Sequence, residues 1–171
     1  MAEQHKGEQE WLLRQIAGCE SILEIGSRNG SNLSDMASVC KPGARIYSID
    51  IGIDDKGNHT ADLMGTIESL NAKGYKAEAL ISDSTSPKAI AWAKQRAPFD
   101  LLFIDGDHTA HYVRADWSNY GPLAKRIGFH DIDAQDLGIK ALWNELKQSH
   151  KTTEISLPGN SHMGIGIVWR Q

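Results

Sequence analysis

The fold of this chain is decided by the stretch Leu101-Leu102-Phe103-Ile104-Asp105-Gly106-Asp107-His108. Its first four residues are all apolar, which is typical of a strand in a parallel sheet that is buried on both faces. The carboxylates and the imidazole then follow at the carboxyl end of the strand, where open α/β sheets bind their ligands. The sequence therefore predicts a chemical site directly after residue 104.

A second stretch of the same kind is Ile127-Gly128-Phe129-His130-Asp131-Ile132-Asp133. It also passes from a short apolar run into acidic and imidazole side chains. Because the carboxyl ends of neighbouring parallel strands meet at one edge of a sheet, the two stretches are expected to bring oxygen and nitrogen ligands together.

Strands and helices are expected to alternate along the rest of the chain. We predict strands at residues 21–25, 45–50, 76–81, about 101–104, about 126–130, 153–157 and 163–169. We predict helices at residues 10–16, 31–40, 61–72, 87–96, 109–120 and 137–148. This alternation is typical of a doubly wound parallel sheet, but only residues 158–162 separate the last two strands, which must form an antiparallel hairpin. The predicted fold class is α/β, with a mostly parallel seven-stranded sheet that contains a C-terminal antiparallel hairpin strand.

Composition indicates one globular domain over residues 1–171, because 40% of the residues are hydrophobic. A net charge of -4 without a basic stretch gives no reason to expect a nucleic-acid partner. The sequence also lacks an apolar run of the ~18–20 residues that cross a membrane, and its polar start differs from a secretory signal. Two isolated cysteines, Cys19 and Cys40, indicate free thiols and a cytoplasmic protein.

The first predicted strand leads into the turn Gly26-Ser27-Arg28-Asn29-Gly30. Only Gly26 of this turn fits the dinucleotide pattern G-x-G-x-x-G. Its glycines allow the backbone to pass close to a ligand, and Glu24 can bind a cationic amino group, which a dinucleotide lacks. Asp50, about twenty residues further on, is placed to accept hydrogen bonds from ribose hydroxyls. The alternative is a tight strand–helix turn in which the acids serve as helix caps, with Ser31 or Asn32 capping the helix that follows.

The stretch from Leu23 to Gly30 resembles the first motif of class I S-adenosylmethionine methyltransferases, acid-x-Gly-x-Gly-x-Gly, with Arg28 in place of the middle glycine. Arg28 puts a bulky side chain where the backbone of the family usually approaches the cofactor. The resemblance implies a Rossmann-like methyltransferase fold that binds S-adenosylmethionine. The cofactor-binding residues that it implies are Glu24, Gly26, Ser27, Gly30, Asp50, Asp83, Ser84 and Asp105.

Residues 103–117 and 129–133 resemble the metal-assisted O-methyltransferases. The likeness is greatest to small enzymes related to cephalosporin-hydroxylase-type and sugar-modifying methyltransferases, and catechol O-methyltransferase is a more distant relative. The resemblance implies a divalent metal site and His108 as the general base. The implied metal ligands are Asp105, Asp107, His130 and Asp131, with Asp107 competing with Asp105. Oxygen ligands favour Mg²⁺, whereas an imidazole ligand shifts the preference toward Mn²⁺, Fe²⁺ or Zn²⁺.

Simpler structural roles stay open for the same residues. Asp105 or Asp107 alternatively caps the following helix. His108 is alternatively a ligand or a partner of a ligand, and His130 a buried histidine of the core. Asp133 is expected to cap the helix that begins near residue 136.

The sequence predicts a cytoplasmic S-adenosylmethionine-dependent O-methyltransferase that acts on a hydroxyl of a small molecule or sugar. A small domain has few insertions to shape an acceptor pocket, so a second subunit of a homo-oligomer, or mobile loops, are expected to complete it. The rivals are an NAD-dependent oxidoreductase on the same architecture, a non-catalytic module that binds S-adenosylmethionine or metal, and a metal-dependent hydrolase.

Overall fold

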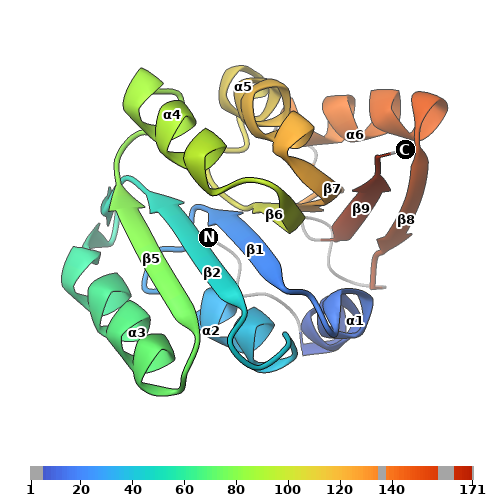
Figure 1. Ribbon diagram of the computed structural model, residues 1–171. Coiled ribbons are helices and arrows are strands. Elements are labelled where there is room, and N and C mark those ends of the chain that lie inside the picture. The colour runs from blue at the N-terminus through green and yellow to red at the C-terminus, as the bar shows by residue number, and fades with distance from the viewer. Residues whose placement is uncertain (1–5, 135–137, 158–163, 171) are drawn as a thin grey trace.

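The computed structural model describes residues 6–134, 138–157 and 164–170. A seven-stranded sheet in the order β5-β2-β1-β6-β7-β9-β8 forms its centre (Figure 1). The strands of the sheet are β1 (Ser21–Ile25), β2 (Arg45–Asp50), β5 (Lys76–Ile81), β6 (Phe99–Ile104), β7 (Ala124–His130), β8 (Lys151–Ile155) and β9 (Ile165–Trp169). The predicted doubly wound, mostly parallel fold with an antiparallel pair near the C-terminus is confirmed.

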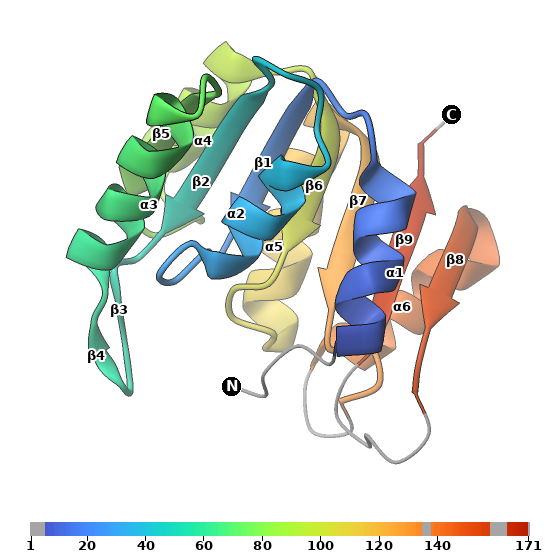
Figure 2. The ribbon, with the colours of Figure 1, turned by 90° about the horizontal axis from the view of Figure 1, so that it is seen from below.

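Helices cover both faces of the sheet (Figures 1 and 2). One layer consists of α1 (Lys6–Ile16), α2 (Ser31–Ser38) and α3 (Thr60–Ala72). The other layer consists of α4 (Pro87–Arg96), α5 (Ala110–Tyr120) with the short 3₁₀ helix η1 (Gly121–Leu123), and α6 (Gly138–Ser149). Each layer has its own apolar core against the sheet. No helix in the described part of the chain is long and apolar enough to span a membrane.

Strand β6 lies at the centre of the sheet, between β1 and β7 and parallel to both. Its last four residues are fully buried. Leu101 and Phe103 pack into the core below α1, α2 and α3, whereas Leu102 and Ile104 pack into the core below α4, α5 and α6. Each such side chain stabilises the fold by about 1.5–3 kcal/mol relative to leaving it exposed. The apolar run is therefore a strand buried on both faces, as the sequence predicts.

The register of the central strands determines which residues meet at the carboxyl edge. Ile104 of β6 pairs with Phe129 of β7, so the next residues along each chain, Asp105 and His130, come side by side. Ile25 of β1 pairs in the same way with Ile49 of β2. The two parallel pairings therefore deliver polar residues from distant parts of the sequence to one edge.

The antiparallel strand lies second from the edge of the sheet. Strand β9 runs antiparallel to both β7 and β8, because the chain first reaches the outer edge with β8 and then returns inward. Only His150 separates α6 from β8, so β8 begins at Lys151, two residues before the predicted start. Residues 158–162, predicted to connect the two strands, lie outside the described residues, as does residue 137, the predicted start of α6.

The predicted side-chain cap of α2 is wrong. Helix α2 begins at Ser31 as expected, but the residue at its N-cap is Gly30, which has a left-handed backbone with φ 81° and makes no side-chain cap. Instead, the side chain of Asn29 accepts a hydrogen bond of 3.2 Å from the Ser31 N–H. Asp133, predicted to cap α6, accepts a hydrogen bond from the hydroxyl of Ser156. The residues directly before α6 lie outside the described part of the chain, so this cap stays a prediction.

The predicted polar loop at residues 54–60 contains regular structure. Strands β3 (Ile53–Asp54) and β4 (Gly57–Asn58) form a short antiparallel hairpin, and α3 begins at Thr60. Figure 2 shows this β3–β4 hairpin extending beyond the carboxyl end of β2, away from the sheet. Sequence analysis could not detect this hairpin, because its polar strands of two residues are too short to show an alternation of apolar residues.

Candidate active site

A cavity of about 390 Å³ lies at the carboxyl edge of the sheet, at the ends of β1, β2, β5 and β6. It is lined by Ile25, Gly26, Arg28, Ile49, Asp50, Ile51, Ile53, Asp54, Asp55, His59, Ser82, Asp83, Ser84, Asp105, Gly106, Asp107 and Tyr112. Six of these residues are aspartates, against a single arginine, so the cavity wall is strongly acidic. Of the predicted cofactor residues, Gly26, Asp50, Asp83, Ser84 and Asp105 border the cavity.

Gly26 brings the turn after β1 into close contact with the end of β6. Its φ is +86°, and a Cβ atom at this position would lie 2.4 Å from the backbone oxygen of Asp105. Only glycine fits both the left-handed conformation and this spacing. Arg28 in the same turn also has a left-handed backbone, with φ 54°.

The other three residues predicted to bind the cofactor lie behind the cavity wall. Glu24 is fully buried, and its Oε1 accepts a hydrogen bond of 2.6 Å from the Asn32 side chain. The hydroxyl of Ser27 accepts one of 2.7 Å from Ser48. Gly30 packs against α3, where a Cβ atom would lie 2.8 Å from Thr66. In the structure these residues support the turn from below and do not line the cavity.

Burial raises the pKa of Glu24 to about 8, which leaves this carboxyl mostly protonated at neutral pH. Its second oxygen, Oε2, is buried without a hydrogen-bond partner in the described parts of the chain. A cationic group close to Glu24 would favour the charged form and lower the pKa again. The charge of Glu24 is therefore sensitive to a nearby cation, although the residue does not line the cavity.

The loop after β5 forms another part of the wall. The Oδ1 atom of Asp83 accepts hydrogen bonds of 2.7 Å from both the backbone N–H and the hydroxyl of Thr85. The Ser84 carbonyl accepts a hydrogen bond from the Tyr120 hydroxyl. Asp116, which the sequence analysis missed, is buried next to this loop, and burial raises its pKa to about 6. Only the packing of α5 against the loop brings Asp116 to this place, so no local sequence signal marks it.

Four of the predicted catalytic and metal residues form a cluster next to the cavity. The Nδ1 atom of His130 lies 3.1 Å from Asp105 Oδ1 and 3.2 Å from Asp131 Oδ1. His108 Nδ1 lies 3.3 Å from Asp131 Oδ2, and His108 Nε2 lies 3.7 Å from Asp105 Oδ1. Asp105 belongs to both the cluster and the cavity wall. We call these four residues the acid–imidazole cluster.

His130 carries a positive charge in this cluster at neutral pH. Burial by itself lowers the pKa of an imidazole, but the carboxylates of Asp105 and Asp131 outweigh burial and raise the pKa of His130 to about 9. Its Nε2 atom and that of His108 have no hydrogen-bond partner among the described residues. The cluster therefore combines two imidazoles that each have an uncommitted nitrogen with two carboxylates that hold the rings in place.

Asp107 does not join the acid–imidazole cluster. Its Oδ1 accepts a hydrogen bond of 2.8 Å from the N–H of Thr109, two residues further on. Thr109 is the N-cap residue of α5, which has no side-chain cap, so Asp107 does not take the capping role that the sequence left open. Within the described residues, no group of three or more His, Cys, Asp or Glu side chains is arranged as a metal site. As described, the cluster is an ion pair of the His130 imidazolium with two carboxylates.

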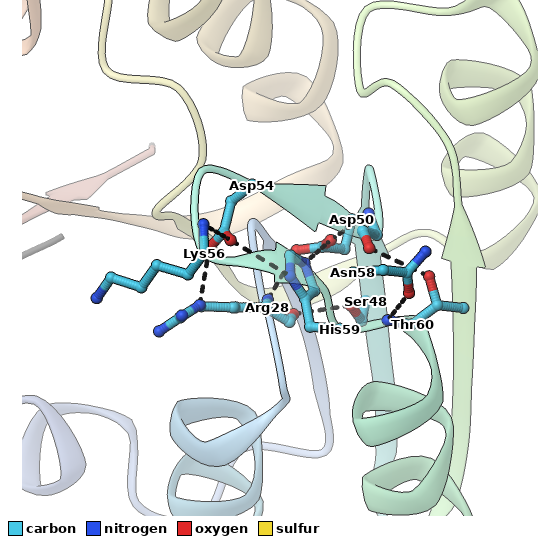
Figure 3. A network of polar contacts seen from close by, with 10 residues as sticks. Arg28, Ser48, Asp50, Asp54, Lys56, Asn58, His59 and Thr60 are labelled. Atoms are coloured by element: carbon cyan, nitrogen blue, oxygen red, sulfur yellow. Dashed lines mark hydrogen bonds and ion pairs between the residues drawn. The ribbon is translucent and has the colours of Figure 1, made fainter.

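A second polar network, formed by Arg28, Asp50, Asp54 and His59, surrounds the end of β2 (Figure 3). The side chain of Arg28 turns toward the β3–β4 hairpin, where its Nε lies 2.8 Å from Asp54 Oδ2. His59 lies 2.9 Å from Asp50. Sequence analysis attributed no function to His59, because its contact with Asp50 depends on the hairpin that brings the two residues together.

Comparison with known protein families found a match. A family of proteins described as "Methyltransferase domain" matches residues 23–132, more than half of the chain. No curated protein matches the sequence.

Solved structures share the fold at low sequence identity. An O-methyltransferase from Bacillus cereus in complex with SAH is 19% identical, with a TM-score of 0.65 over 98% of this chain and 83% of the other. The O-methyltransferase TomG from Streptomyces achromogenes in complex with SAM is 15% identical, with a TM-score of 0.67 over 98% of this chain and 81% of the other. A putative rRNA-methylase from Clostridium thermocellum is 13% identical, with a TM-score of 0.66 over 99% and 98%. At these identities the likeness establishes the fold.

The buried carboxyl of Glu24 predicts a specific pH dependence of stability. Between pH 4.5 and about 8 the folded protein keeps the Glu24 proton while the unfolded chain releases it, so the free energy of unfolding falls as pH rises through this window. Glu24→Gln removes this titration. We therefore compare the free energy of unfolding of the variant with that of wild type at each pH. This difference should favour the variant more at pH 8 than at pH 5, by at least about 1 kcal/mol, given ~1.36 kcal/mol for each unit of pKa shift.

Urea unfolding at the two pH values measures this difference. Glu68→Gln, on the exposed face of α3, is the matched control and should show the same relative stability at both. An equal effect of Glu24→Gln at pH 5 and pH 8 would contradict the raised pKa.

Proposed function

Because this chain belongs to the methyltransferase domain family, which matches residues 23–132, we propose that it transfers a methyl group from S-adenosylmethionine to a hydroxyl oxygen of a small molecule or sugar. The proposal rests on the position of Asp105 between two parts of the site. This residue borders the cavity that contains Gly26 and Asp50, and it also belongs to the acid–imidazole cluster. This position supports a methyl-donor site in the cavity with a proton-accepting group beside it.

The charge of the cavity favours this ligand over the rivals. Six aspartates and one arginine line the wall, which suits a sulfonium cation and disfavours the pyrophosphate of a dinucleotide. The same acidic wall disfavours an RNA backbone, although rRNA-methylase structures share the fold. A small neutral or cationic acceptor is compatible with it. A cytoplasmic location and a homo-oligomeric state remain predictions of the sequence.

In the proposed reaction His108 acts as the general base. Asp131 Oδ2, 3.3 Å from His108 Nδ1, favours the tautomer with its proton on Nδ1. Nε2 is then the basic nitrogen and takes the proton of the acceptor hydroxyl. The acceptor oxygen attacks the methyl carbon in line, and the carbon–sulfur bond breaks with its electron pair left on sulfur. S-adenosylhomocysteine and the methyl ether are the products, and the proton stays on His108 until solvent removes it.

A divalent metal is a further part of the proposal, with Asp105, His130 and Asp131 as its ligands. Octahedral ligands at ~2.1 Å from an ion lie about 3 Å from one another. The His130 Nδ1 atom is 3.1 Å from Asp105 Oδ1 and 3.2 Å from Asp131 Oδ1, which agrees with this spacing for two of the three donor pairs. His130 must lose its Nδ1 proton to act as a ligand, and it gives up its ion pairs in doing so. A bound ion would lower the pKa of an acceptor hydroxyl.

Cofactor binding is the first test. We expect S-adenosylmethionine and S-adenosylhomocysteine to raise the thermal unfolding temperature and NAD to leave it unchanged, because a ligand at a hundred times its Kd stabilises by ~2.7 kcal/mol. Asp50→Asn should weaken S-adenosylhomocysteine binding about tenfold, since it removes a charged hydrogen-bond acceptor. Asp62→Asn, exposed on α3, is the control.

Stabilisation by NAD alone would favour the oxidoreductase instead. Binding without transfer of a labelled methyl group to any member of a panel of phenols, catechols and sugars would favour a non-catalytic binding module.

The role of His108 predicts a selective loss of turnover. We expect His108→Gln to lower kcat by about 10²–10⁴-fold, the usual contribution of a general base, without a change in S-adenosylhomocysteine affinity. His111→Gln, at the exposed second residue of α5, controls for the loss of an imidazole in this segment. Steady-state kinetics and calorimetry measure the two quantities. A kcat of the variant close to that of wild type would exclude His108 as the base.

The metal assignment predicts that metal binding needs the carboxylates of Asp105 and Asp131 but not that of Asp107. We expect Asp105→Asn and Asp131→Asn each to weaken Mn²⁺ binding at least about tenfold, and Asp107→Asn to have little effect because it lies outside the cluster. Titration calorimetry with Mn²⁺ alone measures the affinities. The assignment is wrong if both cluster variants bind Mn²⁺ as wild type does.

A further inference from the structure

The second polar network closes into a ring around the end of β2 (Figure 3). The backbone N–H of Arg28 donates to Asp50 Oδ2 at 2.7 Å, and His59 Nε2 lies 2.9 Å from Asp50 Oδ1. On its other side, His59 Nδ1 lies 3.9 Å from Asp54 Oδ1, and Asp54 Oδ2 returns to the Arg28 side chain at 2.8 Å. We call these four residues the Asp50 ring. All four border the cavity.

The two oxygens of Asp50 are not equally available. A carboxylate has about two acceptor positions on each oxygen. Oδ1 accepts a hydrogen bond of 2.6 Å from the Gly52 N–H and also contacts His59, so both of its positions are used. Oδ2 has one partner among the described residues, the Arg28 N–H, and keeps one position open. Asp50 therefore has a single free acceptor position on its cavity-facing carboxylate.

His59 is firmly held in the position that produces this asymmetry. The residue is only 8% exposed. Its backbone N–H donates to the Gly52 carbonyl at 3.0 Å, and its own carbonyl accepts from the Leu63 N–H in the first turn of α3. The Thr60 hydroxyl donates to the same Gly52 carbonyl at 3.3 Å. Hydrogen bonds of both the backbone N–H and the backbone carbonyl of His59 thus hold its imidazole against Asp50.

We infer that His59 is a positioning residue that makes Asp50 recognise one of the two vicinal hydroxyls of a bound ribose, through Oδ2 alone. This inference rests on the proposed function, because it takes the nucleoside of S-adenosylmethionine as the ligand. Two hydroxyls can share the carboxylate only if His59 releases Oδ1. The ring therefore determines which hydroxyl contributes to affinity.

The test compares S-adenosylhomocysteine with its 2′-deoxy and 3′-deoxy analogues by titration calorimetry on the full chain. With wild-type protein, we expect one analogue to bind about tenfold more weakly, because it leaves the charged acceptor unpaired, and the other to lose less than about threefold. Similar losses for both analogues, or none for either, would overturn the inference. Failure of S-adenosylhomocysteine itself to bind would instead overturn the proposed function.

Variants of His59 then test whether it causes the asymmetry. His59→Leu frees Oδ1 to accept the second hydroxyl, so the affinities of the two analogues should converge to within about threefold. His59→Gln supplies an amide donor to Oδ1 and should restore the difference between them. General damage to the site would weaken all three ligands by one factor and leave their ratio unchanged. A wild-type ratio in His59→Leu would therefore overturn the role of His59.

His150→Gln, directly after α6 and not among the residues that line the cavity, is the matched control and should keep the wild-type ratio. If His59→Leu fails to fold, the wild-type ratio and His59→Gln still decide the inference. An equal loss for both analogues in His59→Gln would contradict it, because the amide donor should still occupy Oδ1.

Discussion

The complete burial of β6 is the constraint on which the rest of the molecule depends. Its apolar side chains alternate between the two cores, so a shift of the strand by one residue would exchange its two faces. The same burial fixes the register with β1 and β7. Asp105 consequently has a fixed position at the end of β6. It lies beside His130 of β7 and in contact with Gly26, which follows β1. The position of the site is thus a consequence of core packing.

Two polar networks share the carboxyl edge, and they differ in kind. The acid–imidazole cluster holds a charged imidazole between two carboxylates, an arrangement that keeps a buried positive charge paired. The Asp50 ring instead links four chain segments, which are the turn after β1, the end of β2, the β3–β4 hairpin and the residue before α3. In it, Arg28 has a left-handed backbone conformation, with φ 54°. Its side chain gains a partner in Asp54, which explains how the turn accommodates a large residue there.

Much of the fold could be predicted from local pattern, because buried parallel strands are apolar and end in polar residues. Strands β1, β2 and β5 begin and end where the sequence predicts. The β3–β4 hairpin could not be predicted, since its strands are too short to show alternation. In the site, Asp105, His108, His130 and Asp131 were predicted and do meet. Asp107 was also predicted, but it binds the start of α5, because adjacent carboxylates separated by Gly106 point in different directions.

The sequence alone determined the class of fold and the chemical types that gather at one edge of the sheet, because apolar runs and the polar residues after them are local properties. Only the tertiary structure decided which of these groups touch. Glu24 lies behind the wall of the cavity and not in it, and His59 reaches Asp50 across a hairpin. Such contacts depend on angles and distances between segments far apart in the chain, which no local pattern encodes.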